Sequence, residues 1–466
     1  MPKKAVAIFF IAALIGAALF VYFTFPRTKE EIPKSNNQRP FPSYPSSPEP
    51  GGVPAPETVP HPNTPQPPHG PTLRVMGWAA PDEAKILETQ ADAFASATGK
   101  RASLTIENNV ADYRRDLKEA LASDTPPDVC MVGARDFSGI DPAQDLIEVK
   151  PNPDTIVRSV EAFTVAGQVR AVPDEFSVEV LFYNPQHFDR AGIGYPDRHW
   201  NWDVLEAMSR ALASLKLKNA AGDSIYPLEL PTDFDFWNIL CTQAGHPALD
   251  LDVWHLSDTG SKDSQMRALD FINEIFHGLV VTAPLPKTNE RPGCFFAQEQ
   301  ASLLIAPSDM VASLPKFHYV RTLLPGDIAR ASLAQVNGWG VTAKSSQPEA
   351  ARILASFLAR QPIHAGWSSV QKPTDANTSD AVCYEALGQA IIPRIDPKAA
   401  PLAQLLDQQI GALARNDRQK TDSLYAQIQS EYQSSAVPPA VESGLPQAVG
   451  VKPSVKADAG AQLRGL

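Results

Sequence analysis

The sequence predicts an α/β protein with two lobes. Strand and helix signals alternate between Leu73 and Asn184 at the spacing of a parallel sheet with crossover helices. The roughly 365 residues from 72 to 436 exceed what one ordinary hydrophobic core holds. A content of 43% hydrophobic and 20% charged residues is typical of a normally packed globular protein. Ligands of open α/β sheets bind beyond the carboxyl ends of the strands, so the alternation also predicts where the site lies.

Residues 1–25 predict an uncleaved transmembrane signal anchor. Lys3 and Lys4 precede the apolar run AVAIFFIAALIGAALFVYFTF, whose length of about 20 residues matches a hydrocarbon core. A cleaved signal peptide has a shorter apolar core and a small-x-small cleavage site, whereas this run ends in the bulky Phe23 and Phe25. No cysteine follows it closely, which excludes a lipoprotein anchor. We expect a single-pass protein of the cell membrane with its soluble body on the extracytoplasmic side.

Two low-complexity segments flank the predicted body. Residues 26–71 form a Pro-rich linker, and proline this dense favours extended polyproline II segments of about 3.1 Å per residue. The linker is either a spacer or simply disordered, and its His61 and His69 are interpreted as solvated residues. Residues 437–466 turn again to Pro, Ala, Gly and Ser and are expected to be a disordered tail.

Within the body, periodicity predicts each element in turn. The strand LRVMGW ends at Trp78, and a helix that begins at Pro81 places Leu87, Ala91 and Phe94 on one face. The strand ASLTIEN, a second amphipathic helix and the buried strand of PPDVCMVG follow. Further strands are expected at Val169–Val172, Val178–Tyr183, Ala301–Ala306 and Gly338–Thr342. Further helices are expected after the N-cap Asn201, after a capping box at Ser346–Glu349, and in two final runs, PLAQLLDQQIGALARN and TDSLYAQIQSEY.

Charge and cysteine content exclude several classes of function. A net charge of −11 argues against a nucleic-acid partner, because the phosphate backbone requires a basic surface. The four cysteines are scattered without a CxxC or a Cys/His metal spacing, so no metal is expected. A disulfide between Cys241 and Cys294 would be compatible with an extracytoplasmic location. The sequence also lacks the phosphate-loop, dinucleotide, GxSxG and HExxH motifs, so neither a cofactor nor catalysis is expected.

Five stretches in chain order resemble the family 1 extracellular solute-binding proteins of ABC importers, the maltose-binding-protein-like carbohydrate group. They are LRVMGWAAPDEAKILETQADAFASATGKRASLTIE, YRRDLKEALASDTPPDVCMVGARDF, GQVRAVPDEFSVEVLFYNPQHFDRAGIGYPDRHWNWDVLEAM, FFAQEQASLLIAPSDM and NGWGVTAKSSQPEAARILASFL. The resemblance implies a type II periplasmic-binding-protein-like fold with a hinge and an interlobe cleft over residues 72–436. Lobe 1 would hold about 72–177 and 336–390, and lobe 2 about 184–334 and 391–436.

The resemblance implies a function of capture rather than catalysis. The chain would bind a small solute, expected to be a carbohydrate, and deliver it to the permease subunits of an ABC importer as a monomer. Many relatives are cleaved or carry an acylated cysteine, and the expected spanning helix departs from that pattern. The same fold could therefore serve as a ligand-binding sensor or adhesin component, an alternative that the sequence leaves open.

A sugar presents hydroxyls and flat apolar C–H faces, so its site needs aromatic planes and planar polar groups. Trp78 follows the first strand, and Asp136 and Phe137 follow the third, all at carboxyl ends. Phe176 lies just ahead of the strand that enters the second lobe. These four residues are predicted ligand contacts from the first lobe. Their structural alternatives are packing between loops and, for the neighbouring Arg135, a surface ion pair.

Three more ligand contacts are predicted from later in the chain. Trp237 lies in a helix whose start carries Asp233 and Asp235, although acids at a helix start are often only partners of the helix dipole. Asp309 ends the strand SLLIAP. Trp339, in VNGWGV, matches a stretch in which relatives bring an aromatic residue against the ligand, and it is the leading candidate.

Overall fold

The computed structural model describes residues 72–435, apart from 198, 257, 259, 279–281, 285–292, 316, 374–379, 397–398 and 416–420. The predicted anchor at 1–25, the linker at 26–71 and the tail at 437–466 lie outside the described residues. Between residues 72 and 435, no described helix combines the length and the apolar character that a membrane crossing requires.

One mixed sheet organises the described body, in the strand order β2-β1-β3-β12-β6-β10-β7. Its strands are β1 (Leu73–Trp78), β2 (Ala102–Glu107), β3 (Val129–Gly133), β6 (Ala171–Tyr183), β7 (Tyr226–Glu229), β10 (Ala301–Pro307) and β12 (Ser332–Val341). The strands β1, β2 and β3 are parallel, as predicted. The later strand β12 runs antiparallel to both β3 and β6, so the sheet as a whole is not parallel.

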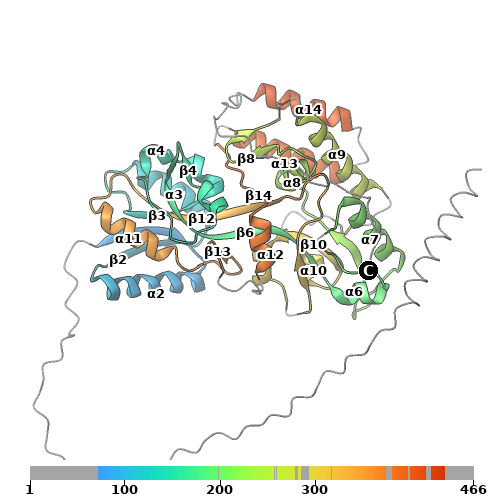
Figure 1. Ribbon diagram of the computed structural model, residues 1–466, viewed down its shortest axis with the longest axis horizontal. Helices are drawn as coiled ribbons and strands as arrows, with labels where there is room; N and C mark the ends of the chain where they lie inside the picture. The colour runs from blue at the N-terminus through green and yellow to red at the C-terminus, as the bar shows by residue number, and fades with distance from the viewer. Residues whose placement is uncertain are drawn as a thin grey trace, which may run out of the picture. The chain divides into compact units, whose positions relative to one another are not determined.

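The main helices pack against this sheet or, like α14, against other helices (Figure 1), and their buried side chains belong to two hydrophobic cores. They are α2 (Pro81–Thr98), α3 (Val110–Ala122), α7 (Trp202–Ser214), α8 (Phe234–Gln243), α9 (Lys262–His277), α11 (Pro348–Leu358), α13 (Ala400–Arg415) and α14 (Thr421–Ser434). Shorter elements of the described part are η1 (Ala134–Gly139), α4 (Pro142–Asp145), α5 (Val157–Glu161), β4 (Thr164–Val165), β5 (Gln168–Val169), α6 (Pro185–Ala191), β8 (Leu249–Asp250), β9 (Val253–Trp254), α10 (Cys294–Ala297), η2 (Ser308–Ala312), β11 (Val320–Thr322), β13 (Ser368–Ser369), α12 (Ala381–Leu387) and β14 (Ala390–Ile391).

The strand β6 joins the two lobes as one continuous strand of 13 residues. Its first half pairs with β12, and its second half pairs with β10 and β11. Successive side chains of a strand point to opposite faces. Its even-numbered residues from Phe176 to Phe182 belong to the first core, while the odd-numbered Leu181 and Tyr183 belong to the second. The odd-numbered positions Glu175, Ser177 and Glu179 are polar, and this row becomes important for the site.

The two cores divide the chain broadly as the two-lobe expectation requires. The first core contains β1, β3, α2 and α11, and the second contains α7, α8, α9, α13 and α14. The division departs from the expected boundaries in one respect. Phe296 and Leu304 belong to the first core although they lie within the range expected for lobe 2, and so does Phe182 from the expected crossover. The reason is the alternation just described, because one face of β6 and β10 continues the first core past the crossover.

Two local expectations need correction. The helix α11 begins with Gln347 as its N-cap, which makes no side-chain capping bond, so the predicted capping box at Ser346–Glu349 is wrong. Glu349 instead pairs with Arg352 one turn later. Cys241 and Cys294 do not form the disulfide that the sequence allowed. By contrast, Asn201 caps α7 as expected, and its side chain accepts the Val204 N–H at 2.8 Å.

We expect a Gly366→Ala substitution to lower the free energy of unfolding by about 2 kcal/mol or more. Gly366 has a φ of 81°, and a Cβ there would lie 2.5 Å from the Asp309 carbonyl oxygen. Chemical denaturation would measure the loss. Gly388→Ala is the matched control, because Gly388 has right-handed helical angles and its new Cβ would meet the Glu385 carbonyl oxygen at an ordinary 3.4 Å. Equal stability of the two variants would contradict the prediction.

Candidate functional site

A cavity of about 550 Å³ lies at the carboxyl ends of β1 and β3. Its walls come from the end of β1, one side of α3, the start of η1, the middle of β12 and the loop that holds Trp367. Ile395 and Ala400 complete it from the segment that leads into α13. This position agrees with the general rule for α/β sheets, and the volume falls in the range of small-molecule sites.

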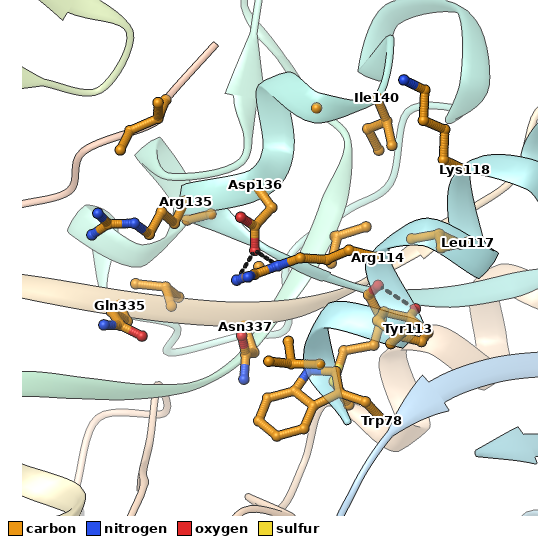
Figure 2. A pocket seen from close by; sticks show the side chains of 18 of the residues that line it. Trp78, Tyr113, Arg114, Leu117, Lys118, Arg135, Asp136, Ile140, Gln335 and Asn337 are labelled. Atoms are coloured by element: carbon orange, nitrogen blue, oxygen red, sulfur yellow. Dashed lines mark hydrogen bonds and ion pairs between the residues drawn. The ribbon is translucent and has the colours of Figure 1, made fainter. Parts of the chain in front are cut away.

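One wall of the cavity carries a charged fork between α3 and η1. The Arg114 guanidinium donates from Nε at 2.7 Å and from Nη2 at 2.5 Å to the same oxygen of Asp136 (Figure 2). Both side chains remain partly exposed, at 47% and 37%. They can therefore still offer donors and acceptors to a ligand, because each has hydrogen-bonding capacity that the pair does not use.

The floor of the cavity carries two polar side chains of β12, backed by a buried polar row on β6. Gln335 and Asn337 of β12 line the cavity and stand opposite Ser177 and Glu175 of β6. The buried Asn337 donates from Nδ2 to the Glu175 carboxylate at 3.0 Å. Figure 2 shows Asn337 between the Arg114–Asp136 pair and the indole of Trp78. The hydrogen bond fixes the amide, so its remaining polar atoms are held ready for a ligand.

Two tryptophans form an aromatic wall, which we define as Trp78 and Trp367. Both line the cavity. Between them lies the buried His364, whose ring centroid is 3.8 Å from that of Trp78 and 5.8 Å from that of Trp367. Indoles of this kind can stack on the apolar faces of a ring-shaped ligand.

An ion pair between the two lobes closes one end of the site. Arg135, at the start of η1, pairs with Asp235 in the first turn of α8. Asp233 caps the same helix and accepts the Phe236 N–H at 2.9 Å. Burial and the charges of Asp233, Asp235 and Asp309 raise the pKa of the nearby Glu179 well above its ordinary value. Asp233 and Asp235 of the second lobe thus place their negative charges near the guanidinium of Arg135.

Replacing Asp233 with asparagine should flatten the dependence of stability on pH. Burial and the neighbouring Asp235 carboxylate raise the pKa of Asp233 to about 7. The folded protein therefore holds a proton that the unfolded chain has released, and stability falls as pH rises from about 4 through about 7. Asparagine stays neutral and is an equally good N-cap, so at pH 8 the variant should be more stable by up to about 4 kcal/mol, because each pKa unit corresponds to about 1.4 kcal/mol.

Urea denaturation at a series of pH values would measure this slope. The control is Asp141→Asn, because Asp141 is an exposed N-cap that accepts the Gln144 N–H at 3.2 Å in α4. A slope that Asp233→Asn leaves unchanged, or that Asp141→Asn changes equally, would contradict the assignment.

The structure brings together only part of the predicted site. Trp78 and Asp136 line the cavity, and their contact with a ligand stays a prediction. Asp309 lies in η2 outside the lining and accepts a hydrogen bond from the Ser177 hydroxyl at 2.6 Å. Phe137, Phe176, Trp237 and Trp339 are at most 1% exposed and belong to the hydrophobic cores. For these four residues the structure differs from the expectation that they face a ligand.

Each of the four departures has a physical reason. Phe137 points from η1 into the core and packs edge-on against Phe163 at 5.2 Å. Phe176 is on the even-numbered face of β6, one residue out of step with the polar row. Trp237 points from α8 into the second core, and its indole N–H donates to the Gln265 carbonyl oxygen at 3.4 Å.

Trp339 departs because β12 is antiparallel to β3. Asn337 pairs with Gly133 at the carboxyl end of β3, whereas Trp339 pairs with Met131 further inside the sheet. Its indole N–H donates to the buried Asp174 at 3.0 Å. A strand that runs antiparallel meets the cavity with its earlier residues, so the tryptophan lies beneath the floor rather than on it.

The sequence reading also missed several lining residues. Trp367 follows Gly366 in a loop without periodicity, so nothing in the sequence pointed to it. Arg114 and Lys118 also line the cavity, but in the sequence they belong to a charged helix face of the kind that is usually exposed to solvent. Gln335 and Asn337 could have been found from the alternation of β12. Among the described residues, no three His, Cys, Asp or Glu side chains come together in a group that could hold a metal ion.

Comparison with known proteins adds a family and a fold. A family model described as bacterial extracellular solute-binding protein matches residues 80–362, more than half of the chain. A search of curated proteins finds no match.

Solved structures share the fold at low sequence identity. A sugar transporter of Rhizobium etli in an open conformation is 16% identical with a TM-score of 0.64, covering 78% of this chain and 100% of the other. The sugar-binding protein MalE of Xanthomonas citri is 16% identical with a TM-score of 0.64, covering 77% and 95%. The ABC substrate-binding protein Lmo0181 of Listeria monocytogenes, in complex with cycloalternan, is 18% identical with a TM-score of 0.61, covering 77% and 97%.

Proposed function

The chain belongs to the bacterial extracellular solute-binding proteins, and from this premise we propose that it captures a carbohydrate and delivers it to an ABC importer. The family consists of binding proteins without catalytic activity, which confirms the expectation that the chain is not an enzyme. The expected two-lobe α/β solute-binding fold is likewise confirmed.

The observation that carries the carbohydrate proposal is the composition of the cavity wall. Trp78 and Trp367 supply aromatic planes, while the Arg114–Asp136 fork and the Asn337 amide supply planar polar groups. Stacking planes beside bidentate polar groups match the alternating apolar faces and hydroxyl edges of a sugar ring. A volume of about 550 Å³ is large enough for more than one sugar ring. Neighbours in complex with cycloalternan, maltose and maltotetraose support the same ligand class.

A panel of sugars tests this proposal on the full-length protein. Maltose, maltotetraose, cycloalternan and tagatose would be titrated in a calorimeter, with tryptophan fluorescence recorded in parallel. Saturable binding without turnover of the sugar is the expected result. If no sugar of a broad panel binds at millimolar concentration, the carbohydrate proposal fails. A sugar affinity that the substitution Arg114→Ala leaves unchanged would contradict the assigned cavity. Arg190→Ala, on α6 in the other lobe, serves as the control.

Membrane attachment and delivery are separate parts of the proposal. The charged start and the long apolar run of residues 1–25 support a single-pass anchor, which in this proposal keeps the monomeric domain on the extracytoplasmic side. The full chain should sediment with membranes and resist carbonate extraction, and deletion of residues 1–25 should release it. Uptake of the bound sugar by cells tests delivery. Deleting the gene for this protein should abolish that uptake. Binding without any effect on uptake would favour the sensor role instead.

A further inference from the structure

We propose that His364 is a positioning residue, which as an imidazolium holds the aromatic wall in the geometry that binds ligand and releases it on losing a proton. The part that concerns affinity rests on the proposed function, whereas the part that concerns the histidine does not. The proposal adds a control by pH to a site otherwise defined by shape and polarity.

The hydrogen bonds of His364 require both ring nitrogens to carry a proton. Nδ1 faces the Glu175 carboxylate, and Nε2 faces the Trp78 carbonyl oxygen at 3.2 Å. The carbonyl oxygen can only accept, and so can the carboxylate while Glu175 is ionised. A neutral imidazole, which has one N–H, then donates to one of them and directs a lone pair at the other. The imidazolium satisfies both.

Glu175 connects this histidine to the cavity floor. Its carboxylate accepts the backbone N–H of Ile363 at 2.9 Å and of His364 at 3.1 Å, as well as the Asn337 amide. It is completely buried, and its position on β6 is fixed by pairing with β12. The same carboxylate therefore positions one group of the floor and the histidine behind the wall.

A second carboxylate ties the two indole-bearing segments together. Glu83 of α2 accepts the Ala80 N–H, beside Trp78, and the Ala365 N–H, beside Trp367, both at 2.8 Å. The charged groups that face His364 are thus Glu175 from β6 and Glu83 from α2. Asp174, next along β6, receives the Trp339 N–H, and burial together with the Glu175 charge raises the pKa of its carboxyl well above its ordinary value.

These surroundings agree with a charged histidine. Burial alone would lower the pKa of His364, but the hydrogen bond and charge of Glu175, with Glu83 and the Trp78 carbonyl, outweigh it and raise the pKa. The pair is therefore intact below the ordinary pKa of histidine and is lost as pH rises through that raised value. The proton shared with Glu175 is held more strongly, so the contact with Trp78 is the one that breaks.

The first experiment needs no ligand and uses the full-length protein. Nitrogen-15 spectra of the histidine rings should show His364 protonated on both nitrogens at about pH 6, changing to one tautomer toward about pH 9. Tryptophan fluorescence should rise over the same range, because an imidazolium quenches an indole that it touches. His364→Gln and Trp78→Phe should each abolish this rise. His187→Gln is the control, since His187 is also buried but contacts Ser302 and Asn184 in the other lobe.

The second experiment measures affinity for maltotetraose as the probe over the same pH range. Wild type should bind about tenfold more weakly at the alkaline end, and His364→Gln should bind weakly at every pH without a slope. A single tautomer throughout, or a fluorescence rise that survives His364→Gln, overturns the positioning role. If His364 titrates as expected in the ligand-free protein but the affinity for maltotetraose does not depend on pH, the coupling to the ligand is overturned. Failure of every sugar to bind contradicts the proposed function alone, because the ligand-free titration stands apart from it.

Discussion

Replacing Trp339 with alanine should lower the free energy of unfolding by about 3–5 kcal/mol, among the largest losses from a single core truncation. The indole is completely buried and packs against Gly77 of β1, where a Cβ would lie 3.4 Å from its ring. Truncation leaves a cavity in the first core and removes the N–H that Asp174 accepts. The second oxygen of Asp174 already lacks a partner, so the carboxyl would be buried without any hydrogen bond from a side chain.

Chemical denaturation measures this loss, and Trp339→Phe separates its two causes. The phenyl ring keeps most of the volume but has no donor, so it should cost about 1–3 kcal/mol through Asp174 alone. Sugar affinity per folded molecule should change little in either variant, because the indole does not line the cavity. A variant of normal stability that no longer binds sugar would reinstate Trp339 as a ligand contact.

Replacing Trp78 with alanine should weaken sugar binding by about 30-fold or more, the loss typical of a truncated aromatic hot spot. The indole is half-buried at the end of β1, lines the cavity and is backed by the ring of His364. Truncation removes the stacking plane and also the ring contact that supports the histidine. Calorimetric titration with the best sugar of the panel gives the affinity directly.

Tyr195→Ala is the matched control for this variant. Tyr195 is a partly exposed aromatic residue, 46% exposed, that bonds Asp189 in the other lobe and takes no part in the cavity. Its loss should leave the affinity unchanged. Equal affinities of Trp78→Ala and wild type would show that the cavity at the ends of β1 and β3 is not the sugar site.

Much of the fold could be predicted because local patterns decide it. The strand and helix at the start of the body have the bounds that periodicity predicts, and Asn201 caps α7 as its side chain suggests. The mixed direction of the sheet could not be predicted in this way. It depends on β12 pairing between β3 and β6, which are far from it in sequence. Periodicity contains no information about such a partner.

The candidate site was predicted at the level of position rather than of side chains. Residues directly after parallel strands, such as Trp78 and Asp136, line the cavity because strand direction fixes their place. To place Phe176, the prediction needed the register of β6, because an error of one residue moves a side chain to the opposite face of the sheet. To place Trp339, it needed the direction of β12. His364 and Trp367 come from a loop whose path is set by contacts with Glu83 and Glu175, and no local signal encodes those contacts.

The alternation along β12 has a consequence for how new specificities could arise in this protein. Its odd-numbered Gln335 and Asn337 line the cavity, while the neighbouring even-numbered Ala334 and Val336 belong to the first core. A substitution at the exposed Gln335 changes the lining of the cavity without removing apolar volume from that core. Ligand preference can therefore drift by single substitutions there that leave stability almost intact. The buried Ser177 opposite, with its hydrogen bond to Asp309, does not have this freedom.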